Sequence, residues 1–177
     1  MLFGDKGVLL KMMSMVIGFY EFDEENGYLS NWYPSEFTVN GVKFSSMEQY
    51  MMYQKALTFY DRDSANLIIE SDNPAEIKKF GKMVANYDEV IWNGVRQPIV
   101  FRGLMEKFRQ NEDLRERLLD TGDEILAECS PKDKIWGIGL ALDDIRRCEL
   151  NAWKGQNLLG FALMVVRDEL RKEFKNK

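Results

Sequence analysis

The sequence predicts an α+β fold, a single, mostly helical domain with a small antiparallel sheet. Three observations support this. The 177 residues include 45% hydrophobic and 12% aromatic residues, which is enough apolar material for one core. A tight-turn signal lies between two short apolar runs, and several capped helical segments follow it. We expect the domain to span residues 16–177, with residues 1–15 as an N-terminal extension.

The strand signals are short. The run VIGFYEF at residues 16–22 is a plausible strand. The runs FTV (37–39) and VKF (42–44) flank Asn40-Gly41, a dipeptide suited to the positive dihedral angles of a tight hairpin turn. A further candidate strand lies at residues 123–129. The sequence therefore predicts an antiparallel hairpin at residues 37–44.

Helical patterns fill most of the remaining chain. We expect helices over residues 45–59, 61–71, 75–85, 89–110, 112–122 and 158–174. Ser45 or Ser46 can cap the first of these, and Ser45-x-x-Glu48 fits a capping box. Asn73-Pro74 suits a helix start. Pro98 predicts a kink or a break in the helix over 89–110.

Composition excludes several classes of chemistry. The chain has no histidine, so Ser–His and Cys–His catalysis, His-bearing zinc sites and facial-triad iron are ruled out. Cys129 and Cys148 are too few for a four-cysteine site, and we expect them to be reduced thiols in a cytoplasmic protein. We therefore expect neither a metal nor a cofactor.

Charge and hydropathy limit the partners. The 24 basic and 29 acidic residues give a net charge of -5, which argues against binding to long duplex nucleic acid. No apolar run approaches the ~20 residues that span a bilayer, so no membrane partner is expected. A local basic pocket for a phosphate remains compatible with this balance.

Glu48 and Lys55 are a candidate catalytic pair. They are seven residues apart on one predicted helix, so they share a face about 10 Å apart along the axis. The carboxylate could stabilise an oxocarbenium-like centre or activate water, and the lysine could hold a phosphate or attack an opened ribose aldehyde. The alternative is structural: Glu48 serves the capping box and Lys55 is solvated. Spacing alone favours this alternative.

Two loops carry further candidates. Asn31 and Trp32 precede the hairpin. The Asn31 amide could bind a ribose hydroxyl, and the Trp32 indole could stack on a flat heterocycle. Alternatively, Trp32 could close the core. In the glycine-bearing loop at residues 130–144, Gly137 beside Trp136 would let the backbone approach a ligand closely. Asp133 could be an acid, a ribose binder or a turn-former, and its sequence context favours the turn.

A phosphate cradle is a further candidate at the start of the last helix. Lys154 and Asn157 bracket the segment that leads into this helix. Free backbone N–H groups and the positive end of the helix dipole would attract an anion, and Lys154 would add charge. A basic residue and a glycine before a helix are common, so this pattern has low specificity.

Taken together, these segments resemble the NADAR family, whose best-described branch is the YbiA-like riboflavin-intermediate N-glycosidases. The resemblance runs in order from about residue 16 to residue 174. It rests on FYEF, GYLSNWYP, FTVNGVKFSS, MEQYMMYQKA, NPAEIKKFGK, VRQPIVFRGLMEKF, LLDTGDEILAECSPKDKIWGIG and GQNLLGFALMVVRDELR.

The resemblance implies a mostly helical α+β fold and hydrolysis of the bond between ribose C1′ and a nitrogen. A carboxylate with a nearby cation can support this reaction without a metal. In the YbiA-like branch the substrates are phosphoribosylamino-pyrimidines of the riboflavin pathway. Other members remove ADP-ribose from guanine, so an ADP-ribosylated nucleobase stays open as a partner. The resemblance and the residue patterns together give the following site: catalytic residues Glu48, Lys55 and Asp133, with Asn31, Trp32, Lys82, Trp136, Gly137, Lys154 and Asn157 binding substrate.

Two positions depart from the family pattern. Gln49 stands where the family usually has histidine, so any role of that imidazole is lost or passed to an amide. Lys82 stands where arginine is frequent, which keeps the charge but loses bidentate phosphate recognition. The loss of the histidine is the main support for a second hypothesis, a module that binds an ADP-ribose-like ligand without turnover. The enzyme hypothesis is preferred.

Overall fold

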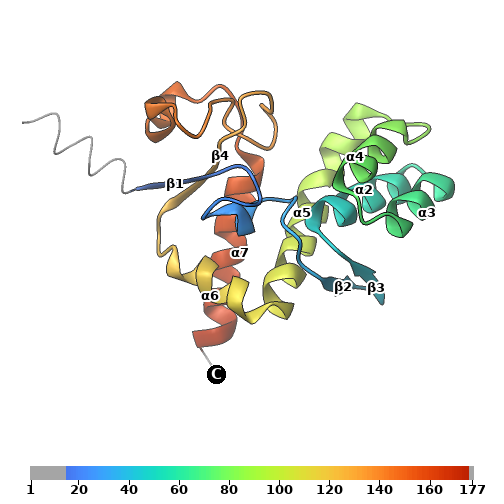
Figure 1. Cartoon of the computed structure of the whole chain (residues 1–177), viewed down its shortest axis with the longest axis horizontal. Coiled ribbons are helices and arrows are strands. Elements are labelled where there is room, and N and C mark those ends of the chain that lie inside the picture. The colour runs from blue at the N-terminus through green and yellow to red at the C-terminus, as the bar shows by residue number, and fades with distance from the viewer. Residues whose placement is uncertain (1–14, 176–177) are drawn as a thin grey trace, which may run out of the picture. The chain divides into compact units, whose positions relative to one another are not determined.

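The computed structural model describes residues 15–175 and confirms the mostly helical α+β fold (Figure 1). Nearly all of the predicted N-terminal extension lies outside the described residues. The chain divides into two compact units. The second unit is Asn31–Arg115, and the first unit comprises the described residues on either side of it.

The secondary structure follows the predicted order. The helices are α2 (Met47–Thr58), α3 (Arg62–Glu70), α4 (Pro74–Met83), α5 (Glu89–Gln110), α6 (Glu112–Asp120) and α7 (Leu158–Lys175). The strands are β1 (Val16–Phe19), β2 (Phe37–Val39), β3 (Val42–Phe44) and β4 (Ile125–Glu128). Three short 3₁₀ helices, η1 (Gly27–Leu29), η2 (Ile145–Cys148) and η3 (Leu150–Ala152), were not predicted.

The hairpin in the second unit is confirmed. Strand β2 pairs antiparallel with β3, with Phe37 opposite Phe44 and Val39 opposite Val42. At the turn, Asn40 and Gly41 have φ values of 52° and 79°. Two positive φ values in a row match the right-handed twist of a two-residue hairpin, which explains why Asn-Gly occupies this turn.

Helix α2 is central in the second unit, where it packs against α3, α4 and α5. Tyr50 on α2 contacts the hairpin aromatics, with its ring centroid 5.9 Å from that of Phe37 and 5.1 Å from that of Phe44. A Cβ atom at Gly81 of α4 would collide with the Met52 side chain. With Met52 in this position, glycine at position 81 allows α2 and α4 to pack closely.

Helix α5 runs through Pro98 without interruption, so the alternative of a break is wrong. The proline ring crowds the carbonyl four residues earlier and leaves it without a helical donor. That carbonyl belongs to Gly94, which is exposed and has open space around its Cα. Water can therefore bond to it, and the helix continues.

The first unit contains a pairing that the sequence did not predict. Strand β1 pairs parallel with β4, with Val16 opposite Ile125. The strand expected over residues 16–22 ends at Phe19, because the chain turns away after it. Parallel neighbours need a long crossover, and here the whole second unit lies between the two strands in the sequence.

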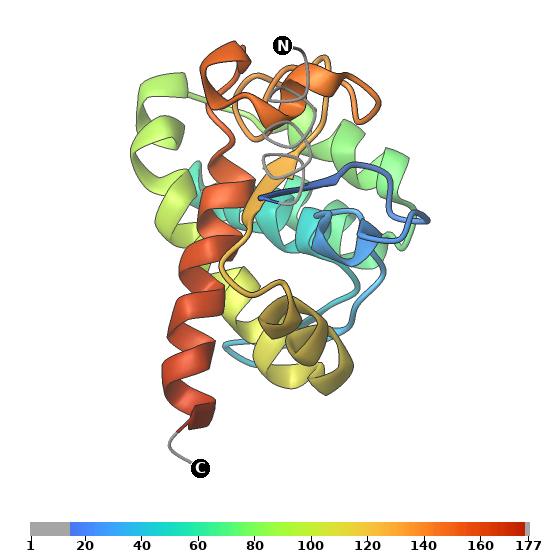
Figure 2. The same cartoon turned by 90° about the vertical axis from the view of Figure 1, so that its left-hand side faces the viewer.

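Helix α7 covers β4 in the first unit (Figure 2). Its residues Leu159, Leu163, Val166 and Leu170 are fully buried and lie on one stripe of the helix. A further buried cluster in this unit comprises Val16, Ala127, Cys129, Ile138 and Leu140. The amphipathic character predicted for this helix is confirmed.

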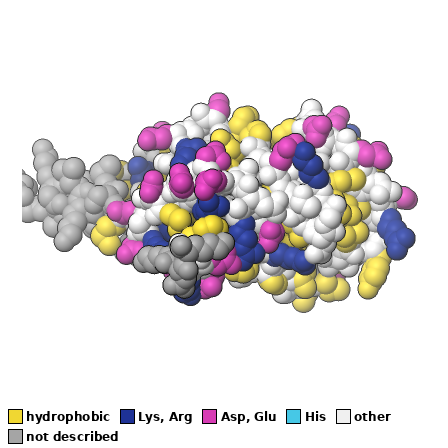
Figure 3. Space-filling view, turned by 90° about the horizontal axis from the view of Figure 1, so that it is seen from below, with side chains coloured by type: hydrophobic (Ala, Val, Ile, Leu, Met, Phe, Trp, Pro, Cys, Tyr) yellow, Lys and Arg dark blue, Asp and Glu magenta, His cyan; other side chains and the backbone are white. Residues whose placement is uncertain are grey.

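The surface carries mixed charge. On the face shown in Figure 3, Asp and Glu side chains are interspersed with Lys and Arg, and no continuous basic surface is seen there. Within residues 15–175, no helix combines the length and the apolar character needed to cross a bilayer.

Lys107 on α5 lies fully buried in the second unit. Its Nζ is 5.5 Å from the ring centroid of Tyr33 and 5.2 Å from that of Phe108. Burial lowers the pKa of Lys107 from 10.5 to about 7. Between these two values the unfolded chain binds more protons than the folded chain, so the free energy of unfolding rises with pH.

We expect the free energy of unfolding to be higher at pH 8.5 than at pH 7, by an amount on the order of 1 kcal/mol. Urea titrations at both pH values measure it. Lys107→Met should remove the difference, whereas Lys43→Met, at an exposed lysine paired with Glu36, should retain it. A wild-type free energy of unfolding that is equal at the two pH values would contradict this account of Lys107.

Candidate functional site

Of the two serines predicted as the cap of α2, the structure uses the second. Ser46 is the N-cap, and its Oγ accepts a hydrogen bond from the Gln49 N–H at 3.2 Å. The Gln49 Oε1 returns to accept from the Ser45 N–H at 2.7 Å. The predicted capping box of Ser45 and Glu48 is therefore wrong. Both pairs fit the sequence pattern, and the structure uses Ser46 with Gln49.

Gln49 also fastens α2 to the end of α3. It is 2% exposed, and its Nε2 donates to the carbonyl oxygens of Ile68 at 3.1 Å and Ser71 at 2.9 Å. A side-chain amide suits this position because it accepts at one end and donates at the other. The residue that departs from the family histidine thus has a structural role in this chain.

We expect Gln49→Ala to lower the free energy of unfolding by about 2–4 kcal/mol, because it leaves several buried backbone groups without partners. Gln54→Ala, at a half-buried glutamine of the same helix, is the matched control and should change stability little. Thermal and urea denaturation measure both. Equal stability of the two variants would show that the Gln49 bonds do not hold α2 and α3 together.

Glu48 is 5% exposed in the first turn of α2. Since Gln49 provides the capping bond, capping no longer accounts for a glutamate at position 48. The Glu48 backbone N–H donates to the Asn31 carbonyl at 2.8 Å. This bond brings the loop that carries Asn31 and Trp32 against the start of α2.

Lys55 is half-buried on the same helix, so the alternative of a solvated lysine is wrong. Its Nζ donates to the Gly81 carbonyl of α4 at 2.7 Å and lies 4.2 Å from the ring centroid of Tyr87. Burial lowers the pKa of Lys55, and the Glu48 carboxylate partly opposes this. The two predicted catalytic side chains are therefore electrostatic neighbours.

Asn31 has a buried amide oxygen. The residue is 6% exposed, and its Oδ1 accepts no hydrogen bond from the described residues. Trp32 is half-buried and does not belong to the core. The Nζ of Lys78 lies 4.9 Å from its indole centroid, a distance typical of a cation–π contact.

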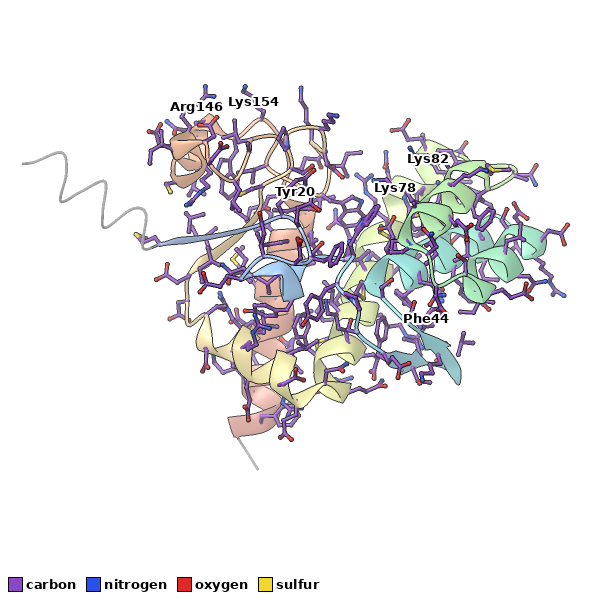
Figure 4. The ribbon with its side chains drawn as sticks, viewed as in Figure 1. Tyr20, Phe44, Lys78, Lys82, Arg146 and Lys154 are labelled. Carbon is purple, nitrogen blue, oxygen red and sulfur yellow. The ribbon has the colours of Figure 1, made fainter. Side chains whose placement is uncertain are left out.

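Of the exposed lysines on helix α4, Lys78 and Lys82 are four residues apart (Figure 4). This spacing places them on one face of the helix. Lys82 was a candidate from the sequence, whereas Lys78 was missed, although its spacing from Lys82 could have indicated it. Tyr87, which covers Lys55, was also missed, and no local pattern marks it.

In the first unit, Asp133 forms a turn. Its Oδ1 accepts from the backbone N–H groups of Ile135 at 2.8 Å and Trp136 at 2.9 Å. The neighbouring Gly137 is buried, and a Cβ atom there would lie 2.8 Å from the Glu128 carbonyl oxygen. The backbone that lies closest to Gly137 is therefore that of β4. Trp136 itself is half-buried.

The phosphate cradle expected at the start of α7 is contradicted. The four backbone N–H groups from Gln156 to Leu159 all donate to carbonyl oxygens of residues 134–137, at 2.9 to 3.2 Å. No free N–H group of these four therefore remains for an anion. Lys154 is exposed.

Asn157 anchors α7 to β4. It is fully buried with a φ of 52°. Its Nδ2 donates to the Leu126 carbonyl at 2.8 Å, and its Oδ1 accepts from the Glu128 N–H at 3.0 Å. Both ends of the predicted substrate-binding amide are therefore engaged with the strand.

The predicted site residues fall into two sets. The second unit gathers Asn31, Trp32, Glu48, Lys55 and Lys82, through the contacts among its first loop, α2 and α4. The first unit holds Asp133, Trp136, Gly137, Lys154 and Asn157 around the loop that precedes α7. The second unit has the chemistry of a reactive site: a buried carboxylate, a lysine with a lowered pKa and a buried oxygen without a donor.

Comparison with known proteins identifies the family. The model of the NADAR domain matches residues 18–171. The chain belongs to the NADAR domain family. An N-glycosidase of Acanthamoeba polyphaga mimivirus is 43% identical over 145 residues, which is 79% of this chain and 85% of the viral protein. A riboflavin biosynthesis protein of Vibrio vulnificus is 34% identical over 160 residues, covering 90% of this chain and 40% of that protein.

A solved structure confirms the fold of this NADAR domain. The NMR structure of Escherichia coli YbiA has a TM-score of 0.77 and 27% identity, and the match covers 93% of this chain and 89% of YbiA. YbiA carries the name N-glycosidase. The resemblance to the YbiA-like branch, stated above from sequence motifs, is thus confirmed.

Proposed function

We propose that this NADAR domain is a metal-independent N-glycosidase, which hydrolyses the C1′–N bond of a phosphorylated ribosyl-heterocycle. The observation that carries the proposal is the pair of Glu48 and Lys55 in the second unit. A buried carboxylate beside a partly buried amine supplies what attack at an anomeric carbon needs. The names of the mimivirus relative and of YbiA support the same reaction class.

Glu48 is the proposed catalytic carboxylate. As the C1′–N bond breaks, its electron pair goes to the heterocycle nitrogen and positive charge develops on the sugar. The Glu48 carboxylate stabilises that charge or removes a proton from the water that attacks C1′. The heterocycle nitrogen then takes up a proton, and the products are free base and ribose phosphate.

Lys55 has two alternative roles. As an ammonium it binds the substrate phosphate. As a neutral amine it bonds to C1′ of the ring-opened sugar, the heterocycle leaves with a proton, and water then cleaves the C1′–lysine bond. The lowered pKa of Lys55 supports the second role because it raises the neutral fraction at a given pH. Its hydrogen bond to Gly81 is compatible with both.

The binding residues of the second unit have complementary roles. Trp32 stacks on the heterocycle, Asn31 orients the ribose and Lys82 contacts the phosphate. In the first unit, Asp133 and Asn157 are engaged in turn and strand bonds, so we assign them positioning roles.

The favoured substrate is a phosphoribosylamino-pyrimidine of the riboflavin pathway, acted on in the cytoplasm. The name of the Vibrio relative supports this choice. The second candidate is removal of ADP-ribose from guanine or from an NAD-derived nucleotide. The third, a module that binds without turnover, rested on the replaced histidine. Its support is weaker because Gln49 is engaged in structural bonds.

The test is to incubate the purified protein with a phosphoribosylamino-pyrimidine, NAD, ADP-ribose and ADP-ribosylated guanosine. Released base is detected by mass spectrometry, and the melting temperature is recorded with each compound. We expect base release from the pyrimidine substrate, unchanged by EDTA. A raised melting temperature without base release on any compound would identify the binding module instead.

A further inference from the structure

The Asn31 side chain is an unusual group to find buried. Its Oδ1 is enclosed and accepts no hydrogen bond within residues 15–175. A buried acceptor without a donor reduces stability by about 1–3 kcal/mol. The buried amide of Gln49, by contrast, is satisfied at both ends.

The position of Asn31 indicates what the missing donor is. Its carbonyl oxygen accepts from the Glu48 N–H at 2.8 Å, so the backbone of Asn31 adjoins that of the proposed catalytic carboxylate. On a ribosyl substrate, the hydroxyl nearest to the reacting C1′ is the one on C2′. The neighbouring Trp32 would hold the heterocycle attached to the same C1′.

We propose that the Asn31 Oδ1 accepts a hydrogen bond from the ribose 2′-hydroxyl and makes the site specific for ribosyl over 2′-deoxyribosyl substrates. This inference rests on the proposed glycosidase function. A site that keeps a buried acceptor for one hydroxyl rejects an analogue that lacks it, because the acceptor then stays unpaired. Hydrogen bonds at this hydroxyl also strengthen in the transition state of glycoside cleavage.

The test compares kcat/KM for a ribosyl substrate and for its 2′-deoxy analogue. We expect wild type to favour the ribosyl substrate by at least about 100-fold. Asn31→Leu, which replaces the amide with an apolar group of similar size, should reduce this preference to a few-fold by slowing the ribosyl reaction alone. Asn31→Asp keeps an acceptor and should retain the preference. Asn66→Leu, at an exposed position of α3, is the matched control.

Stability provides a second readout. Replacing an unsatisfied buried polar group with an apolar one is neutral or stabilising. Asn31→Leu should therefore melt at or above the wild-type temperature while it loses ribosyl activity. A clearly lower melting temperature would indicate a structural role and overturn the proposal.

The kinetic outcomes are also decisive. Equal losses on both substrates in Asn31→Leu, or a wild type that accepts both substrates equally, would overturn the role of Asn31 and leave the glycosidase intact. Absence of base release from either substrate by wild type would instead refute the proposed function itself, and the 2′-hydroxyl assignment with it.

Discussion

Glu48→Gln should lower kcat by at least ~10²-fold while the protein remains folded. The amide keeps the size of the side chain but loses the negative charge that stabilises the sugar cation and the basicity that activates water. Glu48 is not part of the capping box of α2, so its replacement removes no cap. Steady-state base release measures the loss, and thermal denaturation with circular dichroism checks the fold.

Glu70→Gln is the matched control. It makes the same chemical change at an exposed position of α3 in the same unit, and its turnover should equal that of wild type. If Glu48→Gln retained wild-type turnover, the carboxylate would have no role in the reaction. If it unfolded, Glu48→Asp would separate a need for charge from a need for packing.

Lys55→Met should lower kcat/KM by about 10²-fold or more, because both of its proposed roles need the amine. Lys79→Met, at an exposed lysine of α4, is the control and should be neutral. Lys55→Arg separates the roles. A phosphate-binding lysine can be replaced by arginine with kcat retained and KM raised modestly, whereas a nucleophilic lysine cannot. Wild-type kcat/KM in Lys55→Met would exclude both roles.

The pH profile separates the two roles independently. The pKa of Lys55 lies below 10.5 because the side chain is partly buried. If the amine is the nucleophile, kcat rises as pH increases toward that lowered pKa, since the neutral fraction grows. If the ammonium binds phosphate, KM rises as pH passes through the pKa, since the charge is lost. Borohydride trapping of a protein–sugar adduct would support the nucleophile directly.

Local signals predicted most of the fold. The Asn40-Gly41 turn and the Asn73-Pro74 helix start depend on residues within one turn of each other, and the structure contains both. The parallel pair of β1 and β4 was missed because Val16 and Ile125 lie far apart in the chain. The 3₁₀ helices are too short to leave a periodic pattern.

The candidate site shows where sequence reasoning reaches its limit. Two overlapping capping patterns were present at the start of α2, and choosing between them required the bonds of Gln49 to the distant end of α3. The prediction of a phosphate cradle at the start of α7 was wrong because the N–H groups there already donate hydrogen bonds to carbonyl oxygens of residues 134–137. The cation–π contact of Lys78 with Trp32 likewise joins residues far apart in sequence.

The central claim is that this NADAR domain breaks a C1′–N bond by hydrolysis at Glu48. The most direct measurement is the product stoichiometry of the phosphoribosylamino-pyrimidine reaction, determined by mass spectrometry for wild type and Glu48→Gln. We predict one free base and one ribose phosphate for each substrate consumed by wild type, and almost none from the variant. Intact substrate after prolonged incubation with wild type, or equal product from both proteins, would contradict the account.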